Sequence, residues 1–213
     1  MIEVIQQINA VRRRVGHRSL EAGEAHSVII SQVYPDPIDD VWDACTNPDR
    51  IPRWFVPVTG DLKPGGRFHI EGNASGTVER CDPPEGFTAT WEFGGQTSWI
   101  EVRLSSEPAG GTRLELEHIA EPGDGKWTEF GPGAVGVGWD MGLMGLATHL
   151  ASGSSIDPQE SAAWMTSGPG REFVTQSSQR WRDANVEAGT DETAAQAAAD
   201  RTTAAYTAGP GDG

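Results

Sequence analysis

Histidine and aromatic side chains are the residues in this sequence whose types and spacing could do chemistry. Imidazole titrates near neutral pH, so a histidine that points inward can orient a ligand or move a proton. His118 is the candidate, because it follows Leu114 and Leu116 at intervals of two and shares their face of a predicted strand. The alternative is a structural histidine bonded to a carbonyl at a strand end. By their positions in a strand and a helix, His69 and His149 are expected to face solvent.

Bulky apolar residues are expected to converge around His118 in one interior space. Ligand pockets are lined mainly by such groups, with few polar side chains. The predicted lining is Trp54, Phe55, Phe68, Ile70, Trp91, Phe93, Leu116, His118, Trp139 and Leu143. A filled core is the alternative, because aromatic residues on the inner face of a sheet commonly pack against one another.

Sequence motifs of known catalytic or metal chemistry are absent. No GxSxG, HExxH, CxxC or phosphate-binding loop occurs, and the 5 histidines are scattered. We therefore predict no catalytic residue, no metal ion and no cofactor. The alternative is a cyclase-like or dehydratase-like enzyme that uses the same interior, with His118 or Asp140 as the proton-transfer group.

Charge and composition restrict the partners. The net charge of −15 disfavours binding to nucleic acid or to an anionic membrane, and no apolar run approaches transmembrane length. With only 2 cysteines, Cys45 and Cys81, and no secretion signal, we expect reduced thiols and a cytoplasmic protein. A cluster of arginines is expected on a solvated helix face: Arg12, Arg13, Arg14 and Arg18.

The elements that would position the predicted lining form an α+β domain. Strand-length segments between residues 66 and 119 alternate apolar and polar residues, which predicts an antiparallel sheet with one buried face. Residues 133–153 predict a long amphipathic helix over that face. Gly138, Gly142 and Gly145 each cost this helix about 1 kcal/mol relative to alanine. Close backbone packing or room for a ligand should compensate.

The terminal segments are predicted to be helical. We divide the chain into an N-terminal helix and linker (1–24), the main domain (25–153), a helical extension (154–206) and a disordered tail (207–213). The N-terminal helix is expected over residues 2–15, with a linker between Gly16 and Gly23. The terminal helices offer a surface for a homodimer.

Short markers in residues 25–153 occur in the order found in one protein family. They are Pro37 followed by Val41-Trp42-Asp43-Ala44, Thr46-Asn47-Pro48, Trp54-Phe55, Asp61-Leu62-Lys63-Pro64-Gly65-Gly66-Arg67-Phe68, Asp82-Pro83-Pro84, Thr90-Trp91-Glu92 and Gly138-Trp139. The chain thereby resembles the bacterial homologues of the activator of heat shock protein 90 ATPase, in the SRPBCC (START-like) superfamily. The resemblance implies a helix-grip fold, a curved antiparallel sheet wrapped around a long C-terminal helix, here with extra N- and C-terminal helices. It implies no single activity.

The residues and the resemblance together lead to one functional expectation. We expect the protein to bind a small hydrophobic or aromatic molecule in a cavity between the sheet and the long helix. Besides the enzyme, a second alternative is a protein-interaction or co-chaperone-like module with a solid core, which would use the terminal helices.

Overall fold

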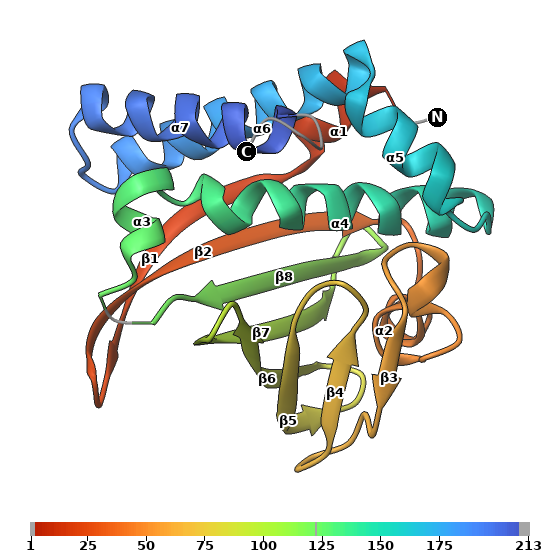
Figure 1. Cartoon of the computed structure of the whole chain (residues 1–213). Coiled ribbons are helices and arrows are strands. Elements are labelled where there is room, and N and C mark those ends of the chain that lie inside the picture. Colours follow the sequence, from red (N-terminus) through yellow and green to blue (C-terminus); the bar gives the residue numbers. More distant parts are fainter. Residues whose placement is uncertain (1–2, 122, 209–213) are drawn as a thin grey trace. The chain divides into compact units, whose positions relative to one another are not determined.

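The computed structural model describes residues 3–121 and 123–208 (Figure 1). The chain forms two compact units, each made from separate stretches of sequence. The first unit contains residues 3–30, 123–141 and 157–208, and the second contains residues 31–121 and 142–156. Two elements, β2 (Gly23–Tyr34) and α4 (Gly133–Ser152), begin in the first unit and continue into the second. Most of the predicted tail, residues 209–213, lies outside the described residues.

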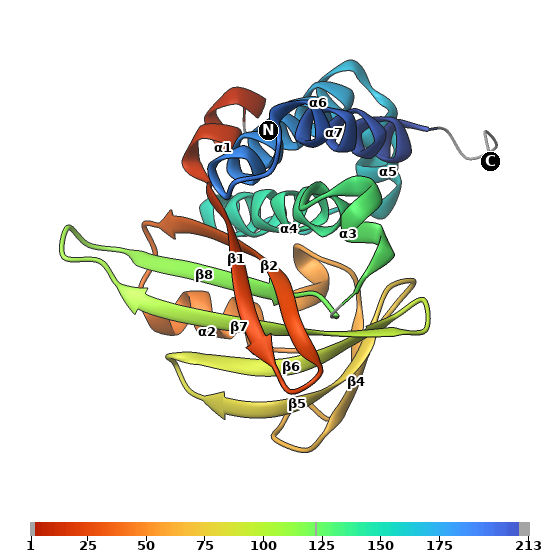
Figure 2. The ribbon, with the colours of Figure 1, turned by 90° about the vertical axis from the view of Figure 1, so that its left-hand side faces the viewer.

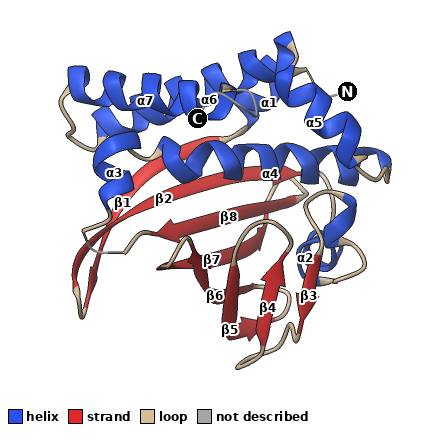
Figure 3. Ribbon diagram, in the orientation of Figure 1, coloured by secondary structure: helices blue, strands red, loops and turns tan. Residues whose placement is uncertain are grey.

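Six consecutive strands form the second unit (Figure 3). They are β3 (Val58–Gly60), β4 (Arg67–Ile70), β5 (Ser75–Asp82), β6 (Gly86–Phe93), β7 (Gln96–Ser106) and β8 (Thr112–Ile119). Each pairs antiparallel with the next, and the strand order of the whole sheet is β1-β2-β8-β7-β6-β5-β4-β3. The strands β5 to β8 are visibly curved (Figure 2). The α+β helix-grip prediction is confirmed, and all predicted strands from 66 to 119 are present. The three-residue β3 was not predicted, because it is too short for an alternation pattern.

Short helices complete the second unit before its sheet. α2 (Ile38–Thr46) has two first-turn aspartates at the favourable end of the helix dipole. A 3-10 turn, η1 (Ile51–Arg53), follows it. The last residues of α4 close the unit, and Leu143 and Leu146 are buried there. Gly153, with φ of +66°, ends α4 as predicted.

The first unit is mainly helical. It contains α1 (Val4–Ala10), β1 (Arg12–Leu20), α3 (Gly125–Phe130), α5 (Pro158–Thr166), α6 (Gly168–Glu187) and α7 (Glu192–Thr207). The helices α6 and α7 lie side by side in both views (Figure 1, Figure 2). The α6 side chains Phe173, Val174 and Trp181 are fully buried and supply the large apolar groups of this core. Asp157 caps α5 by accepting hydrogen bonds from the backbone N–H groups of Gln159 and Glu160.

The prediction for the N-terminal segment is wrong. The helix ends at Ala10 rather than at residue 15, and residues 12–20 form a strand. The expected linker between Gly16 and Gly23 is therefore part of the β1–β2 hairpin. The physical reason is that Arg13 is not on a solvated face: its side chain is only 5% exposed, because it is paired with a buried carboxylate.

The glycines of α4 are explained largely by close packing. A Cβ on Gly136 would overlap the Trp181 indole, and one on Gly145 would overlap the carbonyl oxygen of Trp54. At Gly138 the nearest atom would be the Tyr206 hydroxyl, at 3.4 Å. A Cβ on Gly142 would meet only the Phe55 ring, at 3.9 Å, so that glycine is not required by a close contact.

None of the helices in the described part of the chain is both long enough and apolar enough to cross a membrane.

Candidate functional site

Large apolar residues of β4, β6, β7 and β8 share one buried face of the second unit, which we call the inner face. Its members are Phe68, Ile70, Ala89, Trp91, Ile100, Val102, Leu116 and His118, each with 9% or less of its surface exposed. The register brings them together in rows: Ala89 is opposite Ile100, which is opposite His118 on the next strand. Five of the predicted lining residues therefore lie on one surface: Phe68, Ile70, Trp91, Leu116 and His118.

His118 is a polar residue of this surface, on β8. It is 5% exposed, and its Nε2 lies 2.8 Å from the Oγ of Ser98. The Ser98 hydroxyl donates its single hydrogen to the carbonyl oxygen of Trp91, at 3.1 Å. It therefore accepts a hydrogen bond from His118, which requires the hydrogen on Nε2. The imidazole also meets the Trp91 ring edge-on, with centroids 6.0 Å apart.

Ser98 was missed by the sequence analysis. It stands opposite Trp91 and two residues before Ile100, so strand alternation places it on the inner face. The signal was its alternation with Ile100, an argument that the sequence analysis applied to large apolar residues and histidines but not to serines. The histidine and the serine form a polar pair within an otherwise apolar and aromatic surface.

Trp54, Phe55 and Leu143 lie where the loop after η1 meets the end of α4. The Trp54 indole donates to the carbonyl oxygen of Ala44 at 2.8 Å, and its ring centroid is 5.6 Å from that of Phe55. The carbonyl oxygen of Leu143 accepts a hydrogen bond from the Tyr34 hydroxyl at 3.4 Å. These contacts hold the loop after η1 and this stretch of α4 in place. The role of Trp54, Phe55 and Leu143 in a ligand site stays a prediction.

Phe93 and Trp139 differ from the rest of the predicted lining. Phe93 is the last residue of β6 and exposes 49% of its surface, although the alternation places it on the same face as Trp91. Trp139 is half-buried and belongs to the first unit. Their contribution to a lining also stays a prediction.

The two histidines expected to face solvent have different environments. His69 is exposed, as predicted, with Nδ1 3.0 Å from the Ser75 hydroxyl. The prediction for His149 is wrong, because its side chain is buried. Its Nδ1 donates to the carbonyl oxygen of Ser154 at 2.9 Å, and its Nε2 accepts from Arg50 Nε at 3.4 Å. Arg50 also pairs with two aspartates of α2, so His149 is held in a structural network.

Cys45 is poorly suited to act as a nucleophile. Burial raises the pKa of the Cys45 thiol to about 12, so the thiolate, which is the reactive form, is scarce at neutral pH. Burial, and secondarily the neighbouring Cys45, raises the pKa of the Tyr34 phenol well above its ordinary value. Both groups are therefore protonated under physiological conditions.

Asp140, the other proton-transfer candidate of the enzyme alternative, has a structural environment in the first unit. Its carboxylate is 1% exposed and forms a two-point ion pair with Arg13. Its Oδ2 also accepts from the Ser177 hydroxyl at 2.6 Å and from the Trp181 indole at 2.9 Å. The four hydrogen bonds occupy both oxygens of this carboxylate with structural partners, so Asp140 is poorly placed to contact a substrate.

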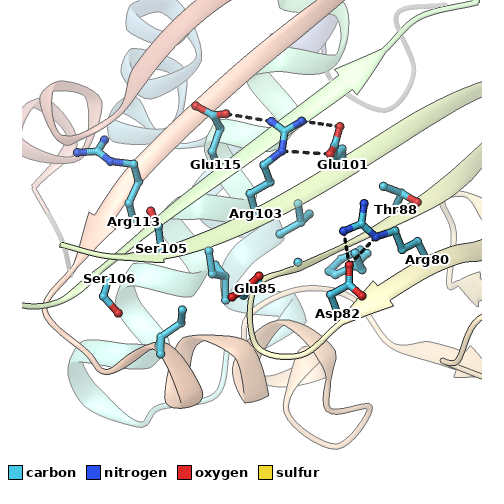
Figure 4. Close-up of a pocket in the computed structure, with 15 residues that line it drawn as sticks. Arg80, Asp82, Glu85, Thr88, Glu101, Arg103, Ser105, Ser106, Arg113 and Glu115 are labelled. Carbon is cyan, nitrogen blue, oxygen red and sulfur yellow. Dashed lines mark hydrogen bonds and ion pairs between the residues drawn. The ribbon is translucent and has the colours of Figure 1, made fainter.

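A separate groove of about 690 Å³ lies on the second unit beside the β5–β6 turn (Figure 4). Charged side chains line it. Figure 4 shows Arg103 between Glu101 and Glu115, and Arg80 against Asp82. Since these arginines already have carboxylate partners, the groove offers them to an anionic ligand only if those ion pairs break.

Most of the second unit matches the model of a known protein family. The model of the activator of Hsp90 ATPase homolog 1-like family matches residues 36–151, which include the α2 segment, the strands β3 to β8 and almost all of α4. The chain belongs to this family. As a member of the activator of Hsp90 ATPase homolog 1-like family, it has the fold that the ordered markers predicted. A comparison with curated protein sequences gave no match.

Solved structures extend the family comparison beyond the matched region. The crystal structure of CalU16 from Micromonospora echinospora is 39% identical, with a TM-score of 0.64, over 82% of this chain and 98% of CalU16. Its solution structure gives 40% identity and a TM-score of 0.69 over 85% and 97%. DynU16, described as a protein in the dynemicin biosynthetic locus, shares the fold at 21% identity and a TM-score of 0.55, over 61% of this chain and 48% of DynU16.

Proposed function

We propose that this family member binds a small hydrophobic or aromatic molecule against the inner face of the second unit. The observation that carries the proposal is the His118–Ser98 pair, which is held within an apolar and aromatic surface. A site of this composition recognises an apolar molecule by burial and orients it through a few polar groups.

The free-energy cost of burying His118 beside Ser98 favours a role for this pair beyond packing. Burying a polar side chain costs free energy, and its internal hydrogen bonds offset that cost only in part. An apolar pair of similar size would pack on this surface without that cost. The His118–Ser98 pair is therefore expected where a ligand carries a group that hydrogen-bonds to it.

The ligand chemistry follows from the surface. The aromatic rings of Phe68 and Trp91 favour a molecule with a flat, unsaturated part. The imidazole and hydroxyl favour one oxygen or nitrogen substituent on that molecule. Phe93, with its exposed ring at the end of β6, offers a further aromatic contact near the Gly94–Gly95 turn.

Binding of a fluorescent aromatic probe tests the proposal. The anionic naphthalene dye 1-anilinonaphthalene-8-sulfonate is titrated into the folded chain, and its emission is measured. We expect saturable binding with one dye molecule per chain. Leu116→Trp fills the inner face and should abolish binding, whereas Glu115→Gln, on the opposite face of the same strand, should leave it unchanged.

The polar pair is tested separately from the apolar surface. A hydroxynaphthalene is compared with naphthalene in competition with the dye. Ser98→Ala and His118→Leu should reduce the preference for the hydroxylated compound, because one hydrogen-bonding group is lost in each. Dye binding that is not saturable, or that Leu116→Trp leaves intact in a folded protein, would contradict the proposal.

A further inference from the structure

Two histidines meet on the β1–β2 hairpin of the first unit. His17 in β1 and His26 in β2 have ring centroids 4.9 Å apart, with the rings tilted by 60°. Both side chains are exposed. Two residues away on the same faces of these strands, Ser19 donates a hydrogen bond to Glu24 at 2.5 Å, which ties the hairpin together beside the pair.

A second ring contact fixes the orientation of the His26 imidazole. His26 stacks on Trp127 of α3, with centroids 4.5 Å apart and the ring planes only 3° from parallel. Part of the entropy cost of placing this ring is therefore met before any ligand binds.

We propose that His17 and His26 form a two-imidazole binding site for a divalent copper ion. Imidazole nitrogens bind such ions at about 2.0 Å, which places each ring centroid about 3.2 Å from the metal. A centroid separation of 4.9 Å then corresponds to an angle of about 100° at the metal. This value is near the 90° between adjacent ligands of the square-planar arrangement that Cu(II) prefers.

The choice of Cu(II) follows from the number of ligands. In the described part of the chain, no group of three or more histidine, cysteine, aspartate or glutamate side chains is arranged to hold a metal ion. A structural zinc site needs four protein ligands. Two imidazoles suit Cu(II), which stands highest among the divalent first-row ions in affinity for nitrogen ligands, and water molecules complete its coordination.

The sequence could not indicate this pair. His17 and His26 are separated by a turn and by several residues, and no short metal-binding motif contains them. They meet because residues 12–20 form a strand, which the sequence analysis predicted as helix and linker.

Copper titration of the full chain, with any affinity tag removed, tests the proposal. CuCl₂ is added in the presence of glycine as a competing chelator, and tryptophan emission and the copper electron paramagnetic resonance spectrum are recorded. We expect one Cu(II) ion per chain, coupling to two imidazole nitrogens, and quenching of Trp127. Trp127→Phe should keep copper binding and lose most of that quenching, because the other tryptophans are not stacked on His26.

Matched histidine variants decide the outcome. His17→Gln and His26→Gln should each weaken binding by about 100-fold, because a second ligand on the same hairpin binds at high effective concentration. His69→Gln, at the exposed histidine of β4, should bind copper as tightly as the parent. The proposal is overturned if both hairpin variants, folded by circular dichroism, bind copper as tightly as the parent, or if the spectrum shows fewer than two imidazole nitrogens.

Discussion

Arg13 holds both carboxylate oxygens of Asp140, with its Nε 2.9 Å from Oδ2 and its Nη2 2.7 Å from Oδ1. The two residues are 127 positions apart in the chain. Arg13 also donates to the carbonyl oxygens of Ile8 and Val11, so one guanidinium joins the end of α1, the start of β1 and the middle of α4. Within the first unit, this side chain is the connection between the N-terminal segment and the long helix.

Removal of the Asp140 charge should strongly destabilise the protein. Asp140→Asn leaves the Arg13 guanidinium buried without its countercharge, a change that typically costs about 3 to 5 kcal/mol in the free energy of unfolding. The measurement is urea denaturation followed by circular dichroism. The control is Glu115→Gln, which removes one carboxylate from the partly exposed Arg103 cluster and should cost less than about 1 kcal/mol.

The double variant Arg13→Met with Asp140→Leu distinguishes a charge effect from a packing effect. Since neither charge remains buried, it should be more stable than Asp140→Asn alone. A double variant whose destabilisation equals the sum of the two single ones would show that the pair does not act through its mutual charge.

Two glycines of α4 should respond oppositely to alanine. Gly142→Ala has only the Phe55 ring to meet, at 3.9 Å, and should raise the free energy of unfolding by up to about 1 kcal/mol through helix propensity. Gly145→Ala would force its Cβ into the carbonyl oxygen of Trp54 and should lower it by about 2 kcal/mol. Thermal unfolding of the two variants side by side checks the contrast, and equal shifts would show that α4 does not approach the Trp54 backbone closely.

The Cys45 thiol should be protected from modification in the folded protein. Its pKa of about 12 and its partial burial both disfavour attack by a disulfide reagent at pH 8. In a Cys81→Ser variant, Ellman's reagent should therefore react slowly until urea unfolds the chain. Reaction at the same rate with and without urea would mean that Cys45 is accessible.

Acidification should weaken the first unit through His26. Its folded-state pKa lies below that of an unfolded histidine, so the unfolded chain binds more protons between those two values. The free energy of unfolding should therefore fall as the pH decreases below about 6.5, and should level off below the folded pKa. His26→Gln should reduce this dependence. Urea unfolding at pH 7 and pH 5 measures it, and an unchanged slope in the variant would assign the effect to other groups.

Strand alternation was sufficient to predict the strands between residues 66 and 119 of the second unit. The segments from residue 66 to 119 are half-buried strands whose apolar residues recur at every second position, and the inward direction of His118 followed from Leu114 and Leu116. The burial of Phe68 and Trp91 could be predicted for the same reason. Local periodicity is enough there because each strand pairs with its neighbour in the chain.

The first unit could not be predicted in this way, because its structure depends on distant pairs. The segment containing Arg13 looks like a solvated helix until Asp140, Ser177 and Trp181 are placed around it. In the second unit, His149 likewise looks exposed until Arg50, just before η1, donates a hydrogen bond to it. In both cases a buried polar group is stabilised by partners that no local sequence pattern reveals.

The composition of the first unit from three separate stretches of chain has a consequence for synthesis. During translation, β1 emerges early, but the Asp140 carboxylate that neutralises Arg13 follows only after the whole sheet of the second unit. The Ser177 and Trp181 donors that complete the network emerge later still. The N-terminal arginine must therefore remain hydrated on the nascent chain while the second unit takes shape. Completion of the first unit is a late event, which occurs once α6 and α7 have left the ribosome.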